Sequence, residues 1–343
     1  MRNGSRAGSR TRTGLLALGA LLVLAYPWLA PNTYLLYAGV LTVMYAVMAT
    51  SWNLLGGFTG YVSLGHSAFF GLGAYGTGLL ITRAGWNWVL ALLVSAVVVA
   101  LFSVLVGIAA VRVRGASFVI VSIALVSMMN LLVQGWRSLT GGSTGLRVPS
   151  QFRELNRGET HLVFFYLFLL LLVVVLLTWW FVGRSRFGSG LRAIREDEDK
   201  AESLGVPTVA FKVAAYALSA LFVALAGGLY AVWFRSLDPI FVFSILIGSY
   251  MVLMSLLGGV RYLFGPLLGA LIVAPAGEYF LVALGESQIH LTATGLLLVL
   301  VVLFMPEGII PAVAKLLRLR KPPEASIREE TAAQRAEMQE AVR

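Results

Sequence analysis

The sequence predicts an all-α, polytopic integral membrane protein with about ten transmembrane helices. Three observations lead to this class: 59% of the 343 residues are hydrophobic, only 12% are charged, and the mean hydropathy is +0.86. Soluble domains carry about 25% charged residues and about 45–50% apolar ones. The composition therefore excludes a soluble globular fold. The sequence contains no cysteine, which excludes disulfides and cysteine-ligated metal sites.

Ten apolar runs are long enough to cross a hydrocarbon core, which takes about 17–25 helical residues. They cover residues 14–30, 34–55, 63–82, 86–111, 116–135, 161–182, 213–234, 241–260, 263–284 and 290–310. The first run follows an arginine-rich arm and has the look of a signal peptide. Because further spans follow at once and no small-x-small cleavage site precedes Pro31, we expect an uncleaved first span. The chain then divides into a basic arm (1–13), a transmembrane domain (14–314) and a polar tail (315–343).

The basic residues indicate the orientation. If ten spans alternate from a cytoplasmic N-terminus, 20 of the 26 Lys and Arg residues fall on the cytoplasmic side. Cytoplasmic loops of membrane proteins carry this excess of positive charge, so both termini are expected in the cytoplasm. The same distribution argues against nucleic acid as a partner, since the +10 net charge flanks the spans and forms no single basic face.

The glycine-rich segment 55–82 predicts a broken or re-entrant helix. Irregular backbone at membrane depth is tolerated only where it is buried in protein or lines a wet cavity. One interpretation is that polar residues of the stretch from Asn53 to Leu80 line a translocation path; these candidates are Asn53, Ser63, His66 and Ser67. The other is that the glycines serve only helix packing and that His66 bonds a neighbouring carbonyl. The residues alone leave both open.

Small residues four apart let membrane helices approach closely. Three such pairs stand out: Ser67 with Gly71, Ala224 with Gly228, and Gly265 with Gly269. We interpret the four glycines of these pairs as packing residues.

The loop 183–212 is unlike the rest of the chain because both signs of charge are dense in it. Residues Arg192 to Gly205 predict one short charged helix that Gly205 caps and Pro207 stops, with Ile194 and Leu204 on a small apolar side. Such a helix fits an element that docks on a soluble partner, whereas a solvated loop is the simpler alternative. The docking candidates are Arg195, Glu196, Asp197, Asp199, Lys200, Ala201, Glu202, Ser203, Leu204 and Gly205.

No catalytic constellation is found, so the chain is not expected to be an enzyme or to hold a cofactor or metal. It contains no GxxxxGK[ST] motif, and therefore binds no ATP through a P-loop of its own. HExxH and GxSxG are also absent.

Four motifs, in order, resemble the LivM-type permease subunits of branched-chain amino acid ABC importers. They are Tyr61 to Tyr75, Arg137 to Leu146, Leu191 to Gly205, and Leu257 to Gly259 followed by Gly265 to Ala270. The resemblance implies a heterodimer with a second permease subunit, two P-loop ATPase subunits, and a periplasmic substrate-binding protein. It also implies a multi-pass protein of the bacterial cytoplasmic (inner) membrane and a coupling helix at Arg195 to Gly205 that sits on an ATPase.

The resemblance predicts import of branched-chain or related hydrophobic amino acids, driven by ATP hydrolysed on separate subunits. A urea or short-amide importer on the same scaffold is the alternative. A different class, an ion-coupled secondary transporter, also stays open. Such transporters usually carry an intramembrane charge, and here Glu278 is the one acidic candidate, near the outer end of its span.

Overall fold

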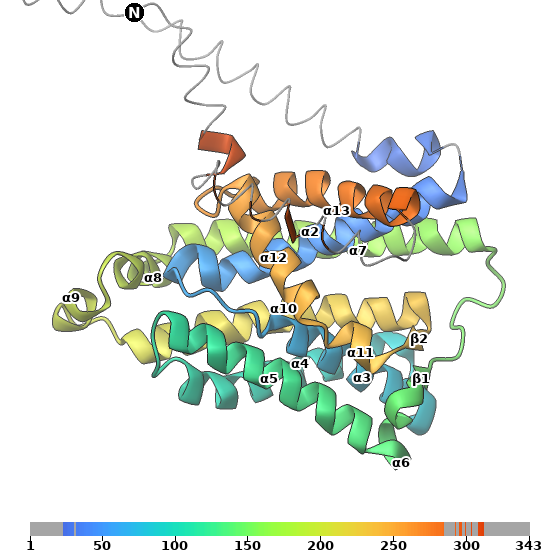
Figure 1. The fold of residues 1–343 in the computed structure, drawn as a ribbon, viewed down its shortest axis with the longest axis horizontal. Coiled ribbons are helices and arrows are strands. Elements are labelled where there is room, and N and C mark those ends of the chain that lie inside the picture. Colours follow the sequence, from blue (N-terminus) through green and yellow to red (C-terminus); the bar gives the residue numbers. More distant parts are fainter. Residues whose placement is uncertain are drawn as a thin grey trace, which may run out of the picture.

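The computed structural model describes residues 23–30, 32–284, 292, 295, 296, 299, 303 and 308–311. Within them the protein is a stack of long helices lying roughly side by side (Figure 1). The long helices are α2 (Thr33–Thr59), α3 (His66–Ala84), α4 (Trp88–Ala110), α5 (Ala116–Gly135), α7 (Arg157–Arg184), α10 (Thr208–Phe234), α12 (Ile245–Gly258) and α13 (Gly265–Leu284). Short elements at the two ends are α6 (Arg137–Thr140), η1 (Gly142–Thr144), β1 (Leu146–Arg147), α8 (Arg186–Glu196), α9 (Glu198–Ser203), β2 (Ser236–Leu237) and α11 (Pro239–Val242).

Helix α2 is the centre of the fold. It packs against α7, α10, α12 and α13, and 78% of its most apolar window is buried, against 33% for α4, α5 and α7. Its core side chains include Trp52, which is 1% exposed. The apolar outer faces of α4, α5 and α7 therefore remain for lipid or another subunit.

Helices α3 and α10 approach so closely that their backbones touch. A Cβ atom placed on Gly73 would overlap the backbone of Ala224, and one on Gly227 would overlap the backbone of Phe70. Only glycine permits this spacing, which brings α3 into the middle of the bundle. Two of the four predicted packing glycines lie nearby: Gly71 faces the ring of Phe243, and Gly228 faces Leu92 and Thr77. The other two lie between α12 and α13, where Gly265 faces the backbone of Gly259 and Gly269 that of Met254.

The predicted apolar runs correspond to helices wherever the structure describes them. Among the described residues, six segments are long and apolar enough to cross a membrane, so the predicted number of about ten spans stays a prediction: 33–59, 88–110, 116–135, 157–184, 208–234 and 239–258. The run predicted as one span over 241–260 is two helices, because Ser244 caps α12 by accepting a hydrogen bond from the backbone N–H of Leu246 (3.2 Å). Most of the first and last predicted spans, the basic arm and the polar tail lie outside the described residues.

Candidate functional site

The glycine-rich segment is broken between α2 and α3. Helix α2 ends at Thr59, and Gly60 adopts the left-handed conformation (φ 77°) that stops it. Residues 60–65 are not helical, and α3 begins at His66. Backbone groups of this break that have no helical hydrogen bond are bonded by side chains: Trp52 Nε1 donates to the Ser63 carbonyl (2.7 Å), and the Leu64 N–H donates to Ser122 Oγ (3.0 Å).

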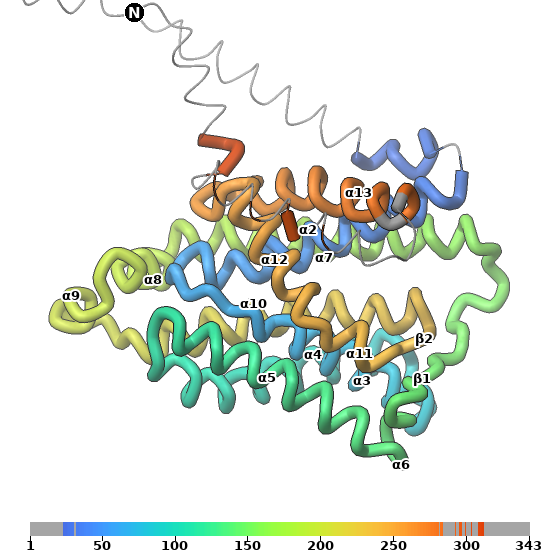
Figure 2. The backbone as a smooth tube through the Cα atoms, in the orientation of Figure 1, coloured from blue at the N-terminus to red at the C-terminus, as the bar shows by residue number. Residues whose placement is uncertain are grey.

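The chain folds back along α2 before α3 starts. Trp52 bonds Ser63, and the Ser51 carbonyl bonds Ser219, which in turn bonds His66. Ser51 and Trp52 lie about two helical turns before the end of α2. At 1.5 Å per residue, eight residues place the start of α3 about 12 Å inside the end of α2. Figure 2 shows this return of the light-blue chain from the end near α8 toward the middle of the bundle. Helix α3 therefore begins in the interior of the helix stack.

His66 is fixed by a chain of hydrogen bonds to α10 and α2. Its Nε2 lies 2.8 Å from Ser219 Oγ, and Ser219 Oγ donates to the Ser51 carbonyl (2.6 Å). Because the single hydroxyl hydrogen of Ser219 goes to that carbonyl, Ser219 accepts from His66, which must carry its proton on Nε2. Nδ1 has no side-chain partner among the described residues, and the backbone of Ser63 is the polar group beside the ring.

The other three predicted path residues are also buried within this subunit. Asn53, Ser63 and Ser67 each have no exposed surface. Neither amide atom of Asn53 has a hydrogen-bond partner among the described residues, and a Cβ on Gly57 would overlap its Oδ1. Ser67 Oγ donates to the Leu64 carbonyl (3.4 Å), so the amide of Asn53 is the group for which burial without a partner is costly. Asn53 directly follows Trp52 in α2, and the Trp52 indole bonds Ser63 in the break, so Asn53 stands one residue from a contact with the break.

The charged loop lies at the end of the stack where α2 finishes, and it corrects one prediction. The predicted single helix is two helices, α8 and α9, separated at Asp197. The Asp197 side chain accepts the backbone N–H of Lys200 (3.0 Å), which makes it the N-cap of α9 and ends α8. Gly205 follows α9 in the left-handed conformation (φ 85°), as its predicted capping role requires.

Helix α9 projects beyond the ends of the long helices (Figure 1). The outward surface of α9 and its cap consists of Asp199, Lys200, Glu202, Ser203, Leu204 and Gly205, whereas Ala201 faces inward. The expected apolar side shared by Ile194 and Leu204 is wrong: Ile194 is 4% exposed and packs on the bundle, but Leu204 is 84% exposed. The Asp197 break turns the two residues in different directions.

Arg195 connects this region to α2. Its Nη1 donates to the Gly57 carbonyl (2.6 Å), and its side chain lies over Gly60. Burial among these groups, together with the charge of Arg261, lowers the pKa of the Arg195 guanidinium from its usual value. Arg195 thus faces the bundle and satisfies a carbonyl at the end of α2. Glu196 points outward and lies 3.7 Å from Arg261.

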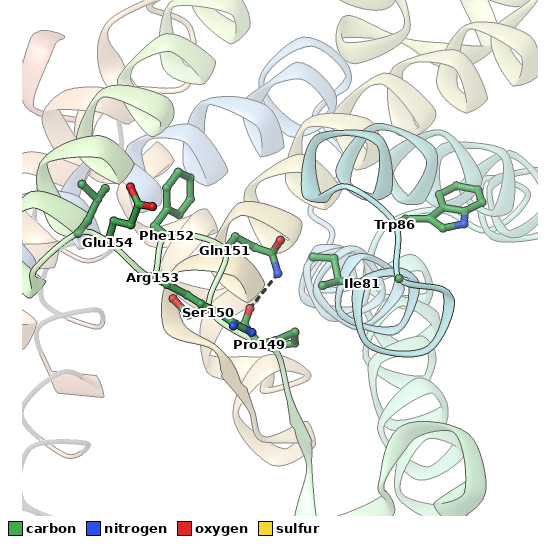
Figure 3. A pocket seen from close by; sticks show the side chains of 10 residues that line it. Ile81, Trp86, Pro149, Ser150, Gln151, Phe152, Arg153 and Glu154 are labelled. Carbon is green, nitrogen blue, oxygen red and sulfur yellow. Dashed lines mark hydrogen bonds between the residues drawn. The ribbon is translucent and has the colours of Figure 1, made fainter.

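The opposite end of the stack carries an open cavity of about 710 Å³ (Figure 3). Ile81, Gly85 and Trp86 line one side, and residues 149–155 line the other. The connection between α5 and α7 that carries this wall is anchored by β1, which pairs with β2 through Leu146 and Leu237. Tyr75 of α3 donates to the Leu237 carbonyl (3.0 Å). The bond from Tyr75 ties the middle of α3 to β2, and Ile81 near the C-terminal end of α3 lines the cavity, while the other end of α3 begins at the break.

Comparison with known proteins identifies the family. Residues 34–305 match the family described as branched-chain amino acid transport system / permease component. The chain belongs to this family. The family is a transport permease component and not a family of enzymes. Its match covers the break, the α8–α9 region and the surface cavity together.

Two relatives extend the similarity over most of the chain. Both carry the name high-affinity branched-chain amino acid transport system permease protein LivM. The Escherichia coli (strain K12) protein is 26% identical over 330 residues, which cover 89% of this chain and 77% of that protein. The Salmonella typhimurium (strain LT2) protein is 26% identical over 334 residues, with the same coverage. No solved structure matches this chain.

Some residues that build the region were not singled out by the sequence. Ser219 and Ser122 are ordinary serines inside apolar runs, and nothing in their spacing links them to the break. Lys212 stands at the start of an apolar run, where a lysine usually reads as a flanking charge, yet it is 1% exposed. Only the fold shows that these side chains meet the break and α9.

Proposed function

We propose that this chain is one of two permease subunits of a bacterial inner-membrane ABC importer for branched-chain or related hydrophobic amino acids. The observation that carries the proposal is the family match over residues 34–305, joined with a helical stack that presents a charged α8–α9 element at one end. Two separate ATPase subunits hydrolyse the ATP, a second permease subunit completes the path, and a periplasmic binding protein delivers the ligand.

The proposed orientation places α8 and α9 in the cytoplasm and the cavity of Figure 3 outside. It is supported by the basic residues around α8, α9 and the start of α10, because cytoplasmic segments carry the excess of Lys and Arg. These are Arg184, Arg186, Arg192, Arg195, Lys200 and Lys212. The open cavity then lies on the side from which a binding protein releases its ligand.

The proposed translocation path passes the break between α2 and α3. Transporters place ligand near discontinuous helices, where helix ends and free backbone groups bind a zwitterion without full charges. The buried amide of Asn53, which has no partner among the described residues, and the buried ring of His66 beside the Ser63 backbone support this placement. Both are enclosed in the isolated subunit, so ligand passage requires the helices around the break to separate.

The proposed coupling surface is the exposed side of α9. Leu204 and the surrounding charges would enter a cleft of an ATPase subunit, where losing one member of a buried charge pair costs about 2–5 kcal/mol. Charge reversal of an exposed residue outside the cleft costs under about 1 kcal/mol. We therefore expect Glu202→Arg and Leu204→Asp to abolish ATPase binding while the permease still inserts. Arg186→Glu, which reverses an exposed charge at the other end of α8, is the matched control.

Uptake measurements test the proposal. Cells that express the chain with its partner subunits should accumulate labelled leucine, and unlabelled valine or isoleucine should compete. Competition by urea or acetamide, with none by leucine, would assign the chain to an amide importer instead. Uptake that persists without any ATPase subunit would contradict the ABC mechanism.

A further inference from the structure

A buried lysine stands where α10 begins. Lys212 is 1% exposed, and its ammonium donates to Glu198 Oε1 (2.6 Å), the Val111 carbonyl (2.9 Å) and Tyr61 Oη (3.2 Å). An ammonium has three donors, so all three are used. A buried charge is tolerated only when it is paired and hydrogen-bonded. Lys212 is therefore held in one position by three separate segments.

Glu198 is the acceptor at the centre of this cluster. Its second oxygen, Oε2, accepts from Tyr61 Oη (2.7 Å), and Arg114 lies 3.3 Å from Oε1. Burial raises the pKa of the Glu198 carboxyl, but the hydrogen bonds from Lys212 and Tyr61 and the positive charges of Lys212 and Arg114 together hold that pKa below its ordinary value. Glu198 thus stays ionised, and its side chain is 11% exposed.

The cluster joins α9 to the broken segment of the membrane path. Glu198 is the first residue of α9, whereas Tyr61 lies in the break, two residues before Ser63. Residues Tyr61 and Glu198 are 137 apart in the sequence, so the contact is a feature of the fold alone. The Tyr61 ring also packs edge-on against Phe118 of α5 (5.0 Å) and lies under the Lys212 ammonium.

The other ion pairs made by α9 side chains are weaker. The Arg114–Asp199 pair is 2.8 Å long but half to three-quarters exposed, and the Asp197–Lys200 pair lies within the loop itself. Exposed pairs of this kind contribute little. Beside the buried Ala201 and the chain connection to α8, Glu198 is the polar side chain through which a movement of α9 reaches Tyr61 and Lys212.

We propose that Tyr61, Glu198 and Lys212 form a joint that transmits movement of α9 to the break between α2 and α3. This inference rests on the proposed function, in which α9 is moved by an ATPase subunit. Tyr61 and Lys212 are positioning residues: they fix where residues 60–65 and the start of α3 lie for each position of α9.

Tyr61→Phe is the most specific test, because it keeps the ring on Phe118 and the Lys212–Glu198 ion pair and removes only the bonds through Oη. In the assembled transporter we expect normal insertion, normal ATPase binding and substantial ATP hydrolysis. The amount of amino acid imported per ATP hydrolysed should fall about tenfold, the size expected for losing a hydrogen bond to a charged group. Arg112→Met, which removes an exposed cation beside Val111, is the control and should keep the wild-type ratio.

The amount of amino acid imported per ATP hydrolysed distinguishes a cluster that transmits movement from one that only stabilises the fold. If Tyr61→Phe keeps the wild-type ratio, the proposal is wrong, whether or not both rates fall together through lost stability. Glu198→Gln and Lys212→Met should lower the ratio in the same way. Their double variant should be no worse than either alone, since each breaks the same connection.

A second measurement needs no transport and no partner. The chain has no native cysteine, so spin labels can be placed on Val62→Cys in the break and Leu204→Cys after α9. In the purified full chain we expect one narrow distance distribution, which Tyr61→Phe broadens and Arg112→Met does not. Identical distributions for Tyr61→Phe and the parent would overturn the joint. Failure of the proposed function is a separate result, seen as no ATP-dependent uptake by the wild-type complex.

Discussion

The packing of α13 against α12 gives a prediction with an internal control. Gly269 of α13 lies so close to α12 that a Cβ atom would overlap the carbonyl of Met254. Gly277, two turns further along α13, has no atom of the described residues within 4 Å of the same position. An alanine at either position gains the same helix propensity, about 0.5–1 kcal/mol. Only Gly269→Ala must push two backbones apart.

The expected difference follows from these contacts. Overpacking a well-packed site costs about 1–3 kcal/mol, and a backbone carbonyl cannot rotate away as a side chain can. We therefore expect Gly277→Ala to unfold at or slightly above the wild-type temperature and Gly269→Ala to unfold below it, when thermal unfolding is followed in detergent. Equal midpoints for the two variants would refute the close contact between α12 and α13.

Three further outcomes are expected. Ser219→Ala leaves His66 Nε2 without an acceptor and should destabilise the protein by about 1–3 kcal/mol, whereas Ser249→Ala, whose hydroxyl bonds only its own helix, should be near neutral in the same unfolding assay. The pKa of Glu198 is lower in the folded protein, so the ionised Glu198 stabilises the fold above the ordinary pKa of 4.5, and this stabilisation is lost as the pH falls through the lowered pKa. The unfolding midpoints of wild type and Glu198→Gln should therefore converge on acidification, and a constant gap between them would contradict the pairing. Reporter fusions after Lys212 should register cytoplasm and one after Arg147 the outside, and the reverse pattern would overturn the proposed orientation.

The helices can be predicted from the sequence because the pattern that indicates each one is local. Apolar runs bounded by turn residues fix where α4, α5 and α7 lie, and the glycines around Gly60 mark the break before any contact is known. Asp197 also carries a local signal, since an aspartate can cap the helix that follows it, but the charged residues on both sides of it predict one continuous helix.

The contacts that give these elements a role are not local. Tyr61 meets Glu198 across 137 residues, and His66 meets Ser219 across 153. Neither pair belongs to a periodic pattern, so no spacing in the sequence predicts it. The burial of Lys212 cannot be predicted from the sequence either, because a lysine at the start of a span shows the same sequence pattern whether it is solvated or buried.

Reconstitution tests the central claim most directly. The purified chain, alone and assembled with its second permease subunit, two ATPase subunits and binding protein, is placed in liposomes, and ATP hydrolysis and labelled leucine import are measured together. We expect the chain alone to hydrolyse no ATP and the full assembly to import leucine only when ATP is present. ATP hydrolysis by the pure chain, or leucine import by the chain alone driven by an ion gradient, would contradict the account.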